Sequence, residues 1–509
     1  MNSNQDKSGI QVNQSDQTLD LLIVGGGING VGIAADAAGR GLSVCLCEMG
    51  DLASATSSWS TKLIHGGLRY LENYDFLLVR KSLMEREVLT QAAPHIIKPL
   101  AFQIPQLNNS RNSLLIQAGL FLYDNLAKRD RFKASRRVNY GEESPLNPSI
   151  RRGFEYWDAQ VDDSRLVVLN ALQARNKGAE ILNYCECQKI EPEGEGWKVT
   201  LYDQRQRREL VRHCHVLVNA AGPWVASLLE SLTHAPAPHK IRLVKGSHIV
   251  VPRVHPGKEA YLLQHHDGRV VFVIPYLGKY SLIGTTEEEY SGDPGAAKIS
   301  NDEINYLVSI ANLYFRKSVL RSEIVSTFSG VRPLIDEDEK NASKVSRDYR
   351  LELIEDPAPI LSVYGGKVTT YRLLAERVMN ELGQYFPRMR GNWTKKALLP
   401  GGDFDMSENL FRELASKYAW LGPEIIHRWL GSYGTLSYEL LRNARSLGDM
   451  GVHFGHGLYQ REVDYLCRNE WANSAQDVLW RRSKLGYQFD DKQKLSLQNY
   501  IEQTYGAQG

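Results

Sequence analysis

Hydrophobic positions recur along this chain with two periods, and the period changes from one segment to the next. Residues 19–24 form an apolar run that predicts a buried strand, residues 33–40 have helical spacing, and residues 42–48 predict a second strand. This order is that of a β-α-β unit, which occupies about 30 residues. Further helices are predicted at residues 77–90, 114–126, 161–178 and 301–316, and short strands near 180–190, 197–203, 216–220 and 361–364.

The middle and the end of the chain have contrasting patterns. Residues 241–286 contain alternating runs separated by turn residues, which predicts an antiparallel sheet. Residues 131–152 are polar and are expected to form a loop. From residue 405 to residue 505 the pattern is helical with few strand signals, and the LPGGD sequence at 399–403 marks a boundary before it.

The composition excludes several classes of protein. Hydrophobic residues make up 42% and charged residues 24% of the 509 positions. These values are typical of a soluble globular protein rather than a disordered, fibrous or multi-span membrane protein. At about 150 residues per domain, the length predicts about two to four domains. The 61 Lys and Arg against 59 Asp and Glu give no reason to expect a nucleic-acid partner.

The apolar runs of the chain do not predict a membrane span. Residues 1–18 are polar, lack the apolar core of a signal peptide, and are expected to form a disordered tail. No run of about 18 or more residues has the composition of a transmembrane helix. The protein is therefore expected in the cytosol or on a membrane face.

The cysteine and histidine residues predict neither disulfides nor a metal site. Four of the six cysteines form two C-x-C pairs, at 45 and 47 and at 185 and 187. This spacing suits small apolar side chains on one face of a strand and fits neither zinc nor a disulfide framework. The thirteen histidines show no metal-ligand spacing, so we expect buried, reduced thiols and no metal.

A glycine-rich turn follows the first predicted strand. Gly25, Gly27 and Gly30 have the spacing Gly-x-Gly-x-x-Gly between a strand and a helix. The first glycine allows a tight turn, the second lets the backbone approach a pyrophosphate, and the third lets helix and strand pack closely. Glu48 ends the second strand, where a carboxylate accepts hydrogen bonds from an adenosine ribose. The unit predicts a bound dinucleotide, and an acid at this position suits both NAD and FAD.

The segment after the second strand favours FAD over NAD. Residues 51–71, DLASATSSWSTKLIHGGLRYL, are rich in hydroxyl groups and glycine and contain Lys62, His65, Arg69 and Tyr70. A nicotinamide domain would normally continue with a helix here, whereas hydroxyls and backbone amides suit a long flavin dinucleotide. A solvated linker is the structural alternative. Two later strands end in glycine turns, AAGPW and YGGKVTTYR, where backbone or a helix N-terminus can approach a cofactor.

Eight strings carry a resemblance to a known family. They are IVGGGINGVGIAADAAGRGLSV, ATSSWSTKLIHGGLRYLENYDF, RGFEYWDAQVDDSRLV, KGSHIVVPRVH, VFVIPY, SLIGTT, SGVRPL and YGGKVTTYR. From about residue 20 to the C-terminus, the chain resembles the aerobic, FAD-dependent glycerol-3-phosphate dehydrogenases of the D-amino-acid-oxidase-like flavoprotein group. The polar tail is an addition to the family pattern, and Trp59 replaces a small residue; neither touches an expected site.

The resemblance implies an α/β fold in three parts. These are a discontinuous, Rossmann-type FAD-binding domain, an antiparallel β-sheet domain that bears the substrate, and a C-terminal α-helical domain. The antiparallel and helical patterns described above agree with it independently. The expected segments are 19–75, 150–235 and 325–385 for the FAD-binding domain, 76–149 and 236–324 for the substrate and cap domain, and 400–509 for the helical domain.

The glycine motifs and the matched strings indicate where FAD would bind. The residues expected at the cofactor are Gly25, Gly27, Ile28, Asn29, Gly30, Glu48, Thr56, Ser57, Ser58, Lys62, Leu63, His65, Gly66, Gly67, Ala221, Gly222, Gly365, Gly366, Lys367, Val368 and Thr369.

The substrate implied by the resemblance is sn-glycerol 3-phosphate, which would be oxidised to dihydroxyacetone phosphate. Its phosphate dianion needs cations and forked donors. The family pattern points to Arg69, Tyr70, Arg332 and Lys367, and a surface ion pair is the structural alternative for each basic residue.

A base must take the hydroxyl proton while hydride passes to the flavin. Histidine suits that task near neutral pH, and His248 and His65 are the candidates. Arg332 could instead stabilise a developing alkoxide. Each histidine could also be structural, and His65 could line the flavin.

In the resembled family, electrons pass to a membrane quinone, and the enzyme lies on the membrane without spanning it. Residues 114–133 predict an apolar helix with a basic end, which suits an interfacial segment and a core helix alike. This implies a cytoplasmic protein on the inner face of the cell membrane. The alternatives are a glycerol-3-phosphate oxidase that reduces oxygen, a flavin-bearing protein without catalysis, and a nicotinamide enzyme.

The C-terminal helical segment carries a basic cluster of Trp480, Arg481, Arg482 and Lys484, which predicts a solvated face. Dimerisation, as a homodimer, and docking on lipid both stay open for this segment.

Overall fold

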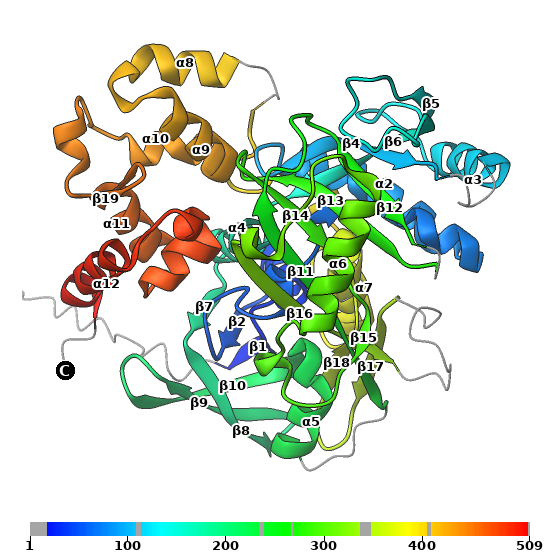
Figure 1. Cartoon of the computed structure of the whole chain (residues 1–509). Helices are drawn as coiled ribbons and strands as arrows, with labels where there is room; N and C mark the ends of the chain where they lie inside the picture. The colour runs from blue at the N-terminus through cyan, green and yellow to red at the C-terminus, as the bar shows by residue number, and fades with distance from the viewer. Residues whose placement is uncertain are drawn as a thin grey trace, which may run out of the picture.

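A computed structural model describes residues 18–107, 113–233, 239–265, 268–335, 348–404 and 409–506. Figure 1 shows two large sheets, one below the other, with the orange and red C-terminal helices to one side. Within the described residues, one sheet has eight strands and the other has ten. The predicted α/β fold class is confirmed. The predicted polar tail falls almost entirely on residues 1–17, which lie outside the described residues.

The eight-stranded sheet is mixed, and its central strands are parallel and come from distant parts of the chain. β1 (Leu19–Val24) lies between β2 (Val44–Glu48) and β10 (Arg208–Asn219), and β18 (Ile360–Tyr364) pairs with the far side of β10. β1, β2 and β18 are almost entirely buried, as is typical of strands covered on both faces. The other strands are β7 (Glu180–Asn183), β8 (Cys185–Glu193), β9 (Gly196–Asp203) and β17 (Arg350–Ile354).

Helix α1 (Ile28–Gly39) packs against two helices that arrive much later in the chain, α4 (Asp163–Asn176) and α7 (Tyr371–Glu381). Its buried face consists largely of alanine and glycine, which lets these neighbours approach closely. A further helix, α5 (Val225–Thr233), follows β10. Because α1 begins directly after β1, its N-terminus lies at the carboxyl edge of the sheet, where α/β proteins bind ligands.

The ten-stranded sheet contains the antiparallel strands predicted for residues 241–286. β11 (Ile241–Pro252), β14 (Tyr280–Gly284), β13 (Val270–Tyr276) and β12 (Ala260–Gln264) are antiparallel neighbours in that order, so the prediction is confirmed. The sheet continues through β4 (Ile97–Pro105), β6 (Arg152–Val161) and β3 (Leu63–Ile64), with β5 (Arg136–Asn139), β15 (Glu288–Glu289) and β16 (Ser326–Ile335) at its sides.

β5 lies inside the segment for which the sequence predicts a loop. The loop prediction is therefore wrong for these four residues. Three of them are exposed, so the strand has no alternating apolar face by which the sequence could reveal it. The division of the chain into domains stays a prediction. β3, β6 and β16, which we grouped with the FAD-binding segments, hydrogen-bond within the ten-stranded sheet.

Helices cover both faces of the ten-stranded sheet. α2 (Phe76–Ala92) and α3 (Ser113–Asn125) pack on one face, and α6 (Asn301–Tyr314) packs on the other. Side chains of strand β11 point alternately to the two faces. Val250 belongs to the hydrophobic core under α2 and α3, and Ile249 belongs to the core under α6.

The C-terminal part has a core of its own around Trp429, Tyr433 and Leu466. The helical pattern predicted for this segment is confirmed, apart from one short two-stranded sheet. Its elements are α8 (Asn409–Lys417), α9 (Pro423–Tyr433), α10 (Ser437–Leu440), β19 (His453–Gly455), β20 (Leu458–Tyr459), α11 (Gln460–Asn469), a π-helix (Asp477–Arg482) and α12 (Asp491–Tyr505).

The basic cluster near residue 480 does not form a solvated face. Arg481, Arg482 and Lys484 are 7%, 0% and 8% exposed, and they pair with Asp51 and Asp162. The prediction of a solvated face is wrong, because the partner carboxylates come from far earlier in the chain. Arg482 and Asp51 are 431 positions apart, so no local charge pattern indicates their pairing.

The cysteines are free thiols in the structure, and burial raises the pKa of the Cys45 and Cys47 thiols well above the ordinary value. Among the described residues, no group of three or more His, Cys, Asp or Glu side chains could hold a metal ion. Every helix in the described segments is too short or too polar to cross a bilayer.

Candidate functional site

A cavity of about 980 Å³ lies between the glycine turn after β1 and the ten-stranded sheet. This volume is within the range of small-molecule and cofactor sites. The predicted site residues on its wall are Gly27, Ile28, Asn29, Thr56, Ser57, Leu63, His65, Gly67, Arg69, Tyr70, Gly222, Arg332, Gly365, Gly366, Lys367, Val368 and Thr369. The other predicted site residues do not line the cavity. They are Gly25, Gly30, Glu48, Ser58, Lys62, Gly66, Ala221 and His248.

The glycine turn is packed too closely for side chains. Gly25 has φ +115°, and a Cβ there would lie 2.5 Å from the carbonyl oxygen of Ala220. A Cβ on Gly30 would lie 1.9 Å from the carbonyl oxygen of Gly25. Gly27 caps the N-terminus of α1 without a side chain. The N-terminus of α1 lines the cavity through Gly27, Ile28 and Asn29, which suits an anionic group, although the Ile28 amide already donates to Ser57.

Glu48 lies at the end of β2 beside this turn. Its carboxylate accepts hydrogen bonds from the amides of Gly26 at 2.7 Å and Gly50 at 2.8 Å. Burial raises the pKa of this carboxyl, although the two backbone donors oppose the effect. The turn itself thus orients Glu48 at the position expected for ribose recognition.

The segment after β2 combines residues that face the cavity with residues that secure the segment. Trp59 lines the cavity, so the expectation that it touches no expected site is wrong. The hydroxyl of Thr56 donates to the carbonyl oxygen of Val331 at 2.7 Å, and the Ser57 hydroxyl oxygen accepts from the Ile28 amide at 3.0 Å. Ser58 donates inward to the carbonyl oxygen of Ala53 at 2.5 Å.

Lys62 is also committed to the protein interior. Its ammonium group donates to the Asp163 carboxylate and to the carbonyl oxygen of Ser58, each at 2.9 Å. The side chain is 5% exposed, so the structure assigns Lys62 to holding this segment rather than to the cavity wall.

The turn after β18 closes the same cavity from another side. The side-chain amide of Asn29 donates to the carbonyl oxygen of Gly365 at 3.1 Å, and the His65 amide donates to the Thr369 hydroxyl oxygen at 3.2 Å. Gly366 has φ +108°, and a Cβ there would lie 3.0 Å from the Asn29 side chain. These contacts join α1, β3 and the turn into one continuous surface.

Three basic side chains, Arg69, Arg332 and Lys367, line the cavity, and we call them the basic wall. Arg332 comes from β16, and the Lys367 ammonium lies 3.8 Å from the centre of the Tyr70 ring. Arg69 pairs with Glu287 at 3.7 Å between Nη1 and Oε2. Sequence reasoning missed Glu287; the signal that could have found it is the acidic run TTEEEY, which follows the matched string SLIGTT.

The two histidine candidates lie in different places. His65 is on the cavity wall. His248 is 1% exposed, its Nε2 lies 3.1 Å from the Thr61 hydroxyl, and its ring stacks on Phe328 at 4.8 Å. Burial, reinforced by the positive charges of Arg332 and Lys62, holds the pKa of His248 well below its ordinary value. The ring is therefore neutral near pH 7 and reaches the cavity only through Thr61.

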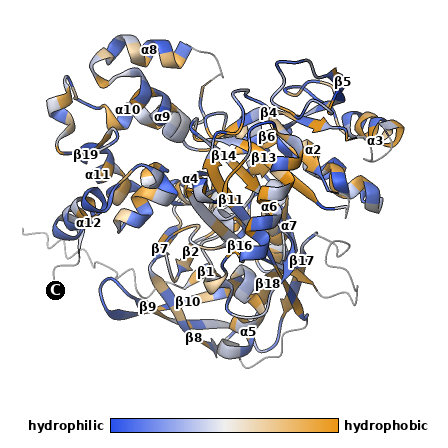
Figure 2. Cartoon of the chain, viewed as in Figure 1, coloured by the Kyte–Doolittle hydropathy of each residue, from blue (hydrophilic) through white to orange (hydrophobic). Residues whose placement is uncertain are grey.

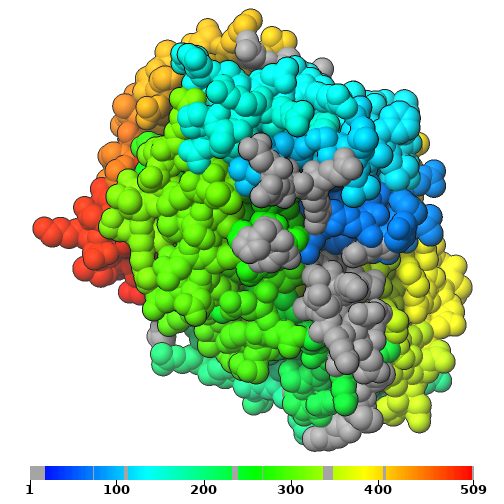
Figure 3. Space-filling model, turned by 45° about the vertical axis from the view of Figure 1, so that its right-hand side comes forward, coloured from blue at the N-terminus to red at the C-terminus, as the bar shows by residue number. Residues whose placement is uncertain are grey.

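Apolar side chains surround the outer end of the cavity. The wall there includes Leu115 and Leu122 of α3, and nearby Leu77, Leu114 and Phe121 are 74%, 69% and 70% exposed. Figure 2 shows hydrophobic residues interspersed with hydrophilic ones along α3, and Figure 3 shows the blue and cyan parts of the chain beside the green part.

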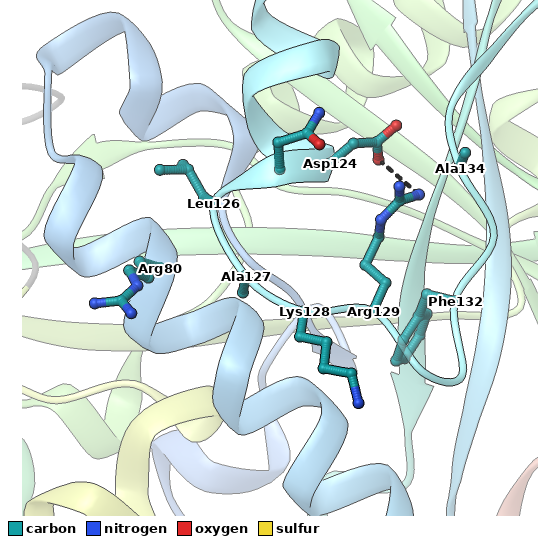
Figure 4. Close-up of a pocket in the computed structure, with 9 residues that line it drawn as sticks. Arg80, Asp124, Leu126, Ala127, Lys128, Arg129, Phe132 and Ala134 are labelled. Carbon is teal, nitrogen blue, oxygen red and sulfur yellow. Dashed lines mark ion pairs between the residues drawn. The ribbon is translucent and has the colours of Figure 1, made fainter.

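A second, more polar hollow of about 590 Å³ lies at the C-terminal end of α3. Figure 4 shows Arg80, Lys128 and Arg129 around it, with Arg129 paired to Asp124 at 3.6 Å. It contains none of the predicted site residues.

Comparisons with known proteins agree with the geometry of the main cavity. Residues 20–351 match a family model described as FAD dependent oxidoreductase, and residues 392–503 match one described as the C-terminal domain of alpha-glycerophosphate oxidase. A glycerol-3-phosphate dehydrogenase of Pseudomonas aeruginosa is 49% identical over 492 residues, which cover 96% of each chain.

Two further similarities define the range of relatives. A D-erythritol 1-phosphate dehydrogenase of Brucella abortus is 44% identical over 92% of this chain and 94% of that protein. The X-ray structure of a glycerol-3-phosphate dehydrogenase from Bacillus halodurans complexed with FAD has a TM-score of 0.74 at 26% identity, covering 96% of this chain and 95% of that one.

Proposed function

Because this chain belongs to the FAD dependent oxidoreductases, and is related over nearly its whole length to glycerol-3-phosphate dehydrogenases, we propose that it oxidises sn-glycerol 3-phosphate to dihydroxyacetone phosphate. The observation that carries this proposal is the shared cavity, which is lined by Arg69, Arg332 and Lys367 as well as by the glycine turn. The family assignment replaces the nicotinamide alternative with FAD.

The residues of the glycine turn fit the diphosphate of FAD. A side chain at Gly25 or Gly30 would clash with backbone, and Gly27 leaves the N-terminus of α1 open to an anion. Glu48, held by the amides of Gly26 and Gly50 beside the turn, would accept from the ribose, and the Ser57 hydroxyl lies on the cavity wall next to the start of α1. When bound, FAD supplies the acceptor for the hydride that leaves the substrate carbon.

The basic wall fits a phosphate monoester. Arg332 presents a forked donor and Lys367 a compact ammonium, which together suit a dianion. Arg69 is held by Glu287, so a phosphate that binds Arg69 must share it with this carboxylate. Tyr70 supports Lys367 through its ring face. These residues bind the phosphate. Because the phosphate and the secondary alcohol belong to one small molecule, holding the phosphate also fixes where the alcohol lies in the cavity.

We assign the role of proton acceptor to His65. It lies on the cavity wall, whereas His248 stands behind Thr61 and has a strongly lowered pKa. A base works best when its pKa is near the working pH, so His248 is the weaker acceptor. Arg332, on the same wall, is placed to stabilise an alkoxide as the proton leaves.

We further propose that the electrons pass to a quinone at the inner face of the cell membrane. The exposed apolar side chains Leu77, Leu114 and Phe121 adjoin the outer end of the cavity, which would let a lipid-soluble acceptor approach without crossing water. Arg80 and Lys128, at the hollow in Figure 4, would face anionic headgroups.

The test of this function is a substrate and acceptor panel with the purified holoenzyme. Glycerol 3-phosphate and D-erythritol 1-phosphate are compared at equal concentration with a water-soluble quinone as acceptor. The proposal predicts higher kcat/KM for glycerol 3-phosphate. A higher kcat/KM for D-erythritol 1-phosphate would contradict the assigned substrate. It would still be consistent with an FAD enzyme that binds the phosphate group of its substrate.

An oxidase that reduces oxygen is the second candidate. It is favoured by the match of residues 392–503 to the C-terminal domain of alpha-glycerophosphate oxidase. Peroxide released per substrate oxidised, measured in air with and without the quinone, separates the two. Stoichiometric peroxide in the absence and presence of quinone would favour the oxidase.

A further inference from the structure

A buried ionic network joins the C-terminal helical part to the segment after β2. Arg482 donates through Nη1 and Nη2 to the two carboxylate oxygens of Asp51, at 2.7 and 2.8 Å. Arg481 donates through Nε to the same carboxylate at 2.5 Å. Asp51 and Arg482 are fully buried, so this contact is a fixed part of the interior rather than an exposed ion pair.

A second contact of the same kind lies at the start of α4. The Lys484 ammonium is 3.3 Å from the Asp162 carboxylate and donates to the Ser164 hydroxyl at 2.5 Å. The Ser164 hydroxyl donates in turn to the carbonyl oxygen of Arg481 at 2.9 Å. We call Asp51, Asp162, Arg481, Arg482 and Lys484 the anchor.

The anchor holds one end of a segment of the cavity wall directly and lies beside the support of the other end. Asp51 begins this segment, residues 51–62, just after Glu48 ends β2. Lys62 ends it, and its ammonium pairs with Asp163, the residue next to Asp162 of the anchor. Between these ends, Thr56 and Ser57 line the main cavity. The C-terminal part therefore contacts the supports of this wall, although none of its residues within 409–506 is on the wall.

The arginine charges of the anchor are paired, which explains how they can be buried: both contact Asp51, and Arg481 also pairs with Asp477. Burial alone would raise the pKa of Asp51, but Arg482 and Arg481 hold the pKa of this carboxyl below its ordinary value. Removing one partner leaves the others buried without full compensation, and the segment must then move to hydrate them.

We infer that the C-terminal helical part acts as a structural component of the FAD site, with Arg482 and Lys484 as positioning residues for segment 51–62. This inference rests on the proposed place of FAD in the main cavity. Its consequence is that the affinity for FAD depends on side chains that do not touch the cofactor. It gives the C-terminal part a role other than dimerisation or lipid docking.

The test compares Arg482→Gln with Arg428→Gln in the full-length chain. Arg428 is a matched control, because it makes a similar two-pronged pair with Glu462 and also donates to the carbonyl oxygen of Gly457, all inside the C-terminal part. Each protein is stripped of FAD, checked for folding by far-UV circular dichroism, and titrated with FAD by flavin fluorescence quenching. The inference predicts that Arg482→Gln raises the Kd for FAD about tenfold or more, while Arg428→Gln leaves it close to that of the parent chain.

Conservative and alternative variants sharpen the result. Arg482→Lys keeps the charge without the fork, so its Kd should fall between those of the parent chain and Arg482→Gln. If Arg482→Gln does not fold, Lys484→Met is judged by the same criterion against Arg428→Gln.

Two outcomes overturn the inference. A folded Arg482→Gln chain with unchanged Kd removes the positioning role, and an equal weakening in Arg428→Gln reduces the effect to general destabilisation. A parent chain that does not rebind FAD at all would instead contradict the place of FAD in the cavity, and the inference with it.

Discussion

Replacing Arg332 by alanine should weaken substrate binding far more than it affects FAD binding. Arg332 is fixed by β16, where it pairs in register with Val244 of β11, and its Nη2 lies 3.3 Å from the position of a Cβ on Gly246. This places the guanidinium on the cavity wall. A hydrogen bond to a charged group contributes about 1.5–3 kcal/mol, which corresponds to an increase in Kd of about 10-fold to 150-fold.

The assay is anaerobic stopped-flow reduction of the bound flavin at increasing concentrations of glycerol 3-phosphate. The concentration dependence gives an apparent Kd, and its plateau gives the limiting rate. Arg332→Lys keeps the charge without the forked donor and should give an intermediate Kd. Arg321→Ala, which removes an exposed arginine outside the cavity, is the control and should leave both values unchanged.

Full FAD content with an unchanged apparent Kd in Arg332→Ala would refute the assignment of Arg332 to the phosphate. A lower limiting rate at unchanged Kd would mean that Arg332 stabilises the alkoxide instead.

Four further predictions address the cofactor turn, the base, acid stability and the membrane. Gly30→Ala introduces a Cβ 1.9 Å from the carbonyl oxygen of Gly25, so FAD affinity and Tm should both fall, by about 1–3 kcal/mol in stability; an unchanged Tm would show that the turn can relax. His65→Gln should lower the limiting rate of flavin reduction by about 100-fold or more at unchanged apparent Kd. A higher apparent Kd with an unchanged limiting rate would contradict the assignment of His65 as the base. Burial, with Arg165 and Lys98, lowers the pKa of His95 to about 3 from the ordinary 6.5, so between these values the unfolded chain binds more protons and stability declines as pH falls. Urea unfolding at pH 7 and pH 5 should show a decline that is smaller in His95→Gln by up to about 1.4 kcal/mol per pH unit, and equal declines would contradict this. Phe121→Asp should reduce co-sedimentation with anionic vesicles without changing oxidation with a soluble dye, whereas unaltered vesicle binding would argue against α3 as the contact.

The sequence predicts the cofactor turn well because the relevant interactions are local. Gly25, Gly27 and Gly30 lie within one strand-turn-helix unit, and the spacing alone implies the close approach that the structure shows. The sequence predicts the antiparallel strands of residues 241–286 equally well, because successive side chains of each strand point alternately into two hydrophobic cores. Resemblance to a family supplied Arg332 and Lys367, which no local pattern connects to the turn.

The sequence does not predict features that depend on contacts between residues far apart in the chain. The sequence predicts a solvated face for Arg481 and Arg482, because their partner, Asp51, is more than 400 positions away. The acidic run that contains Glu287 is only a weak signal for a partner of Arg69, since such a run is more often solvated. His248 and Lys62 lie inside matched strings, but a string does not tell which side chains face a cavity and which face the interior.

Anaerobic mixing of the yellow holoenzyme with glycerol 3-phosphate is the most direct measurement of what the cavity does. Full loss of the flavin absorption band, with one dihydroxyacetone phosphate formed for each FAD reduced, is the predicted result. A band that persists in protein with a full complement of FAD would contradict a site in which the basic wall presents a phosphate ester to the flavin.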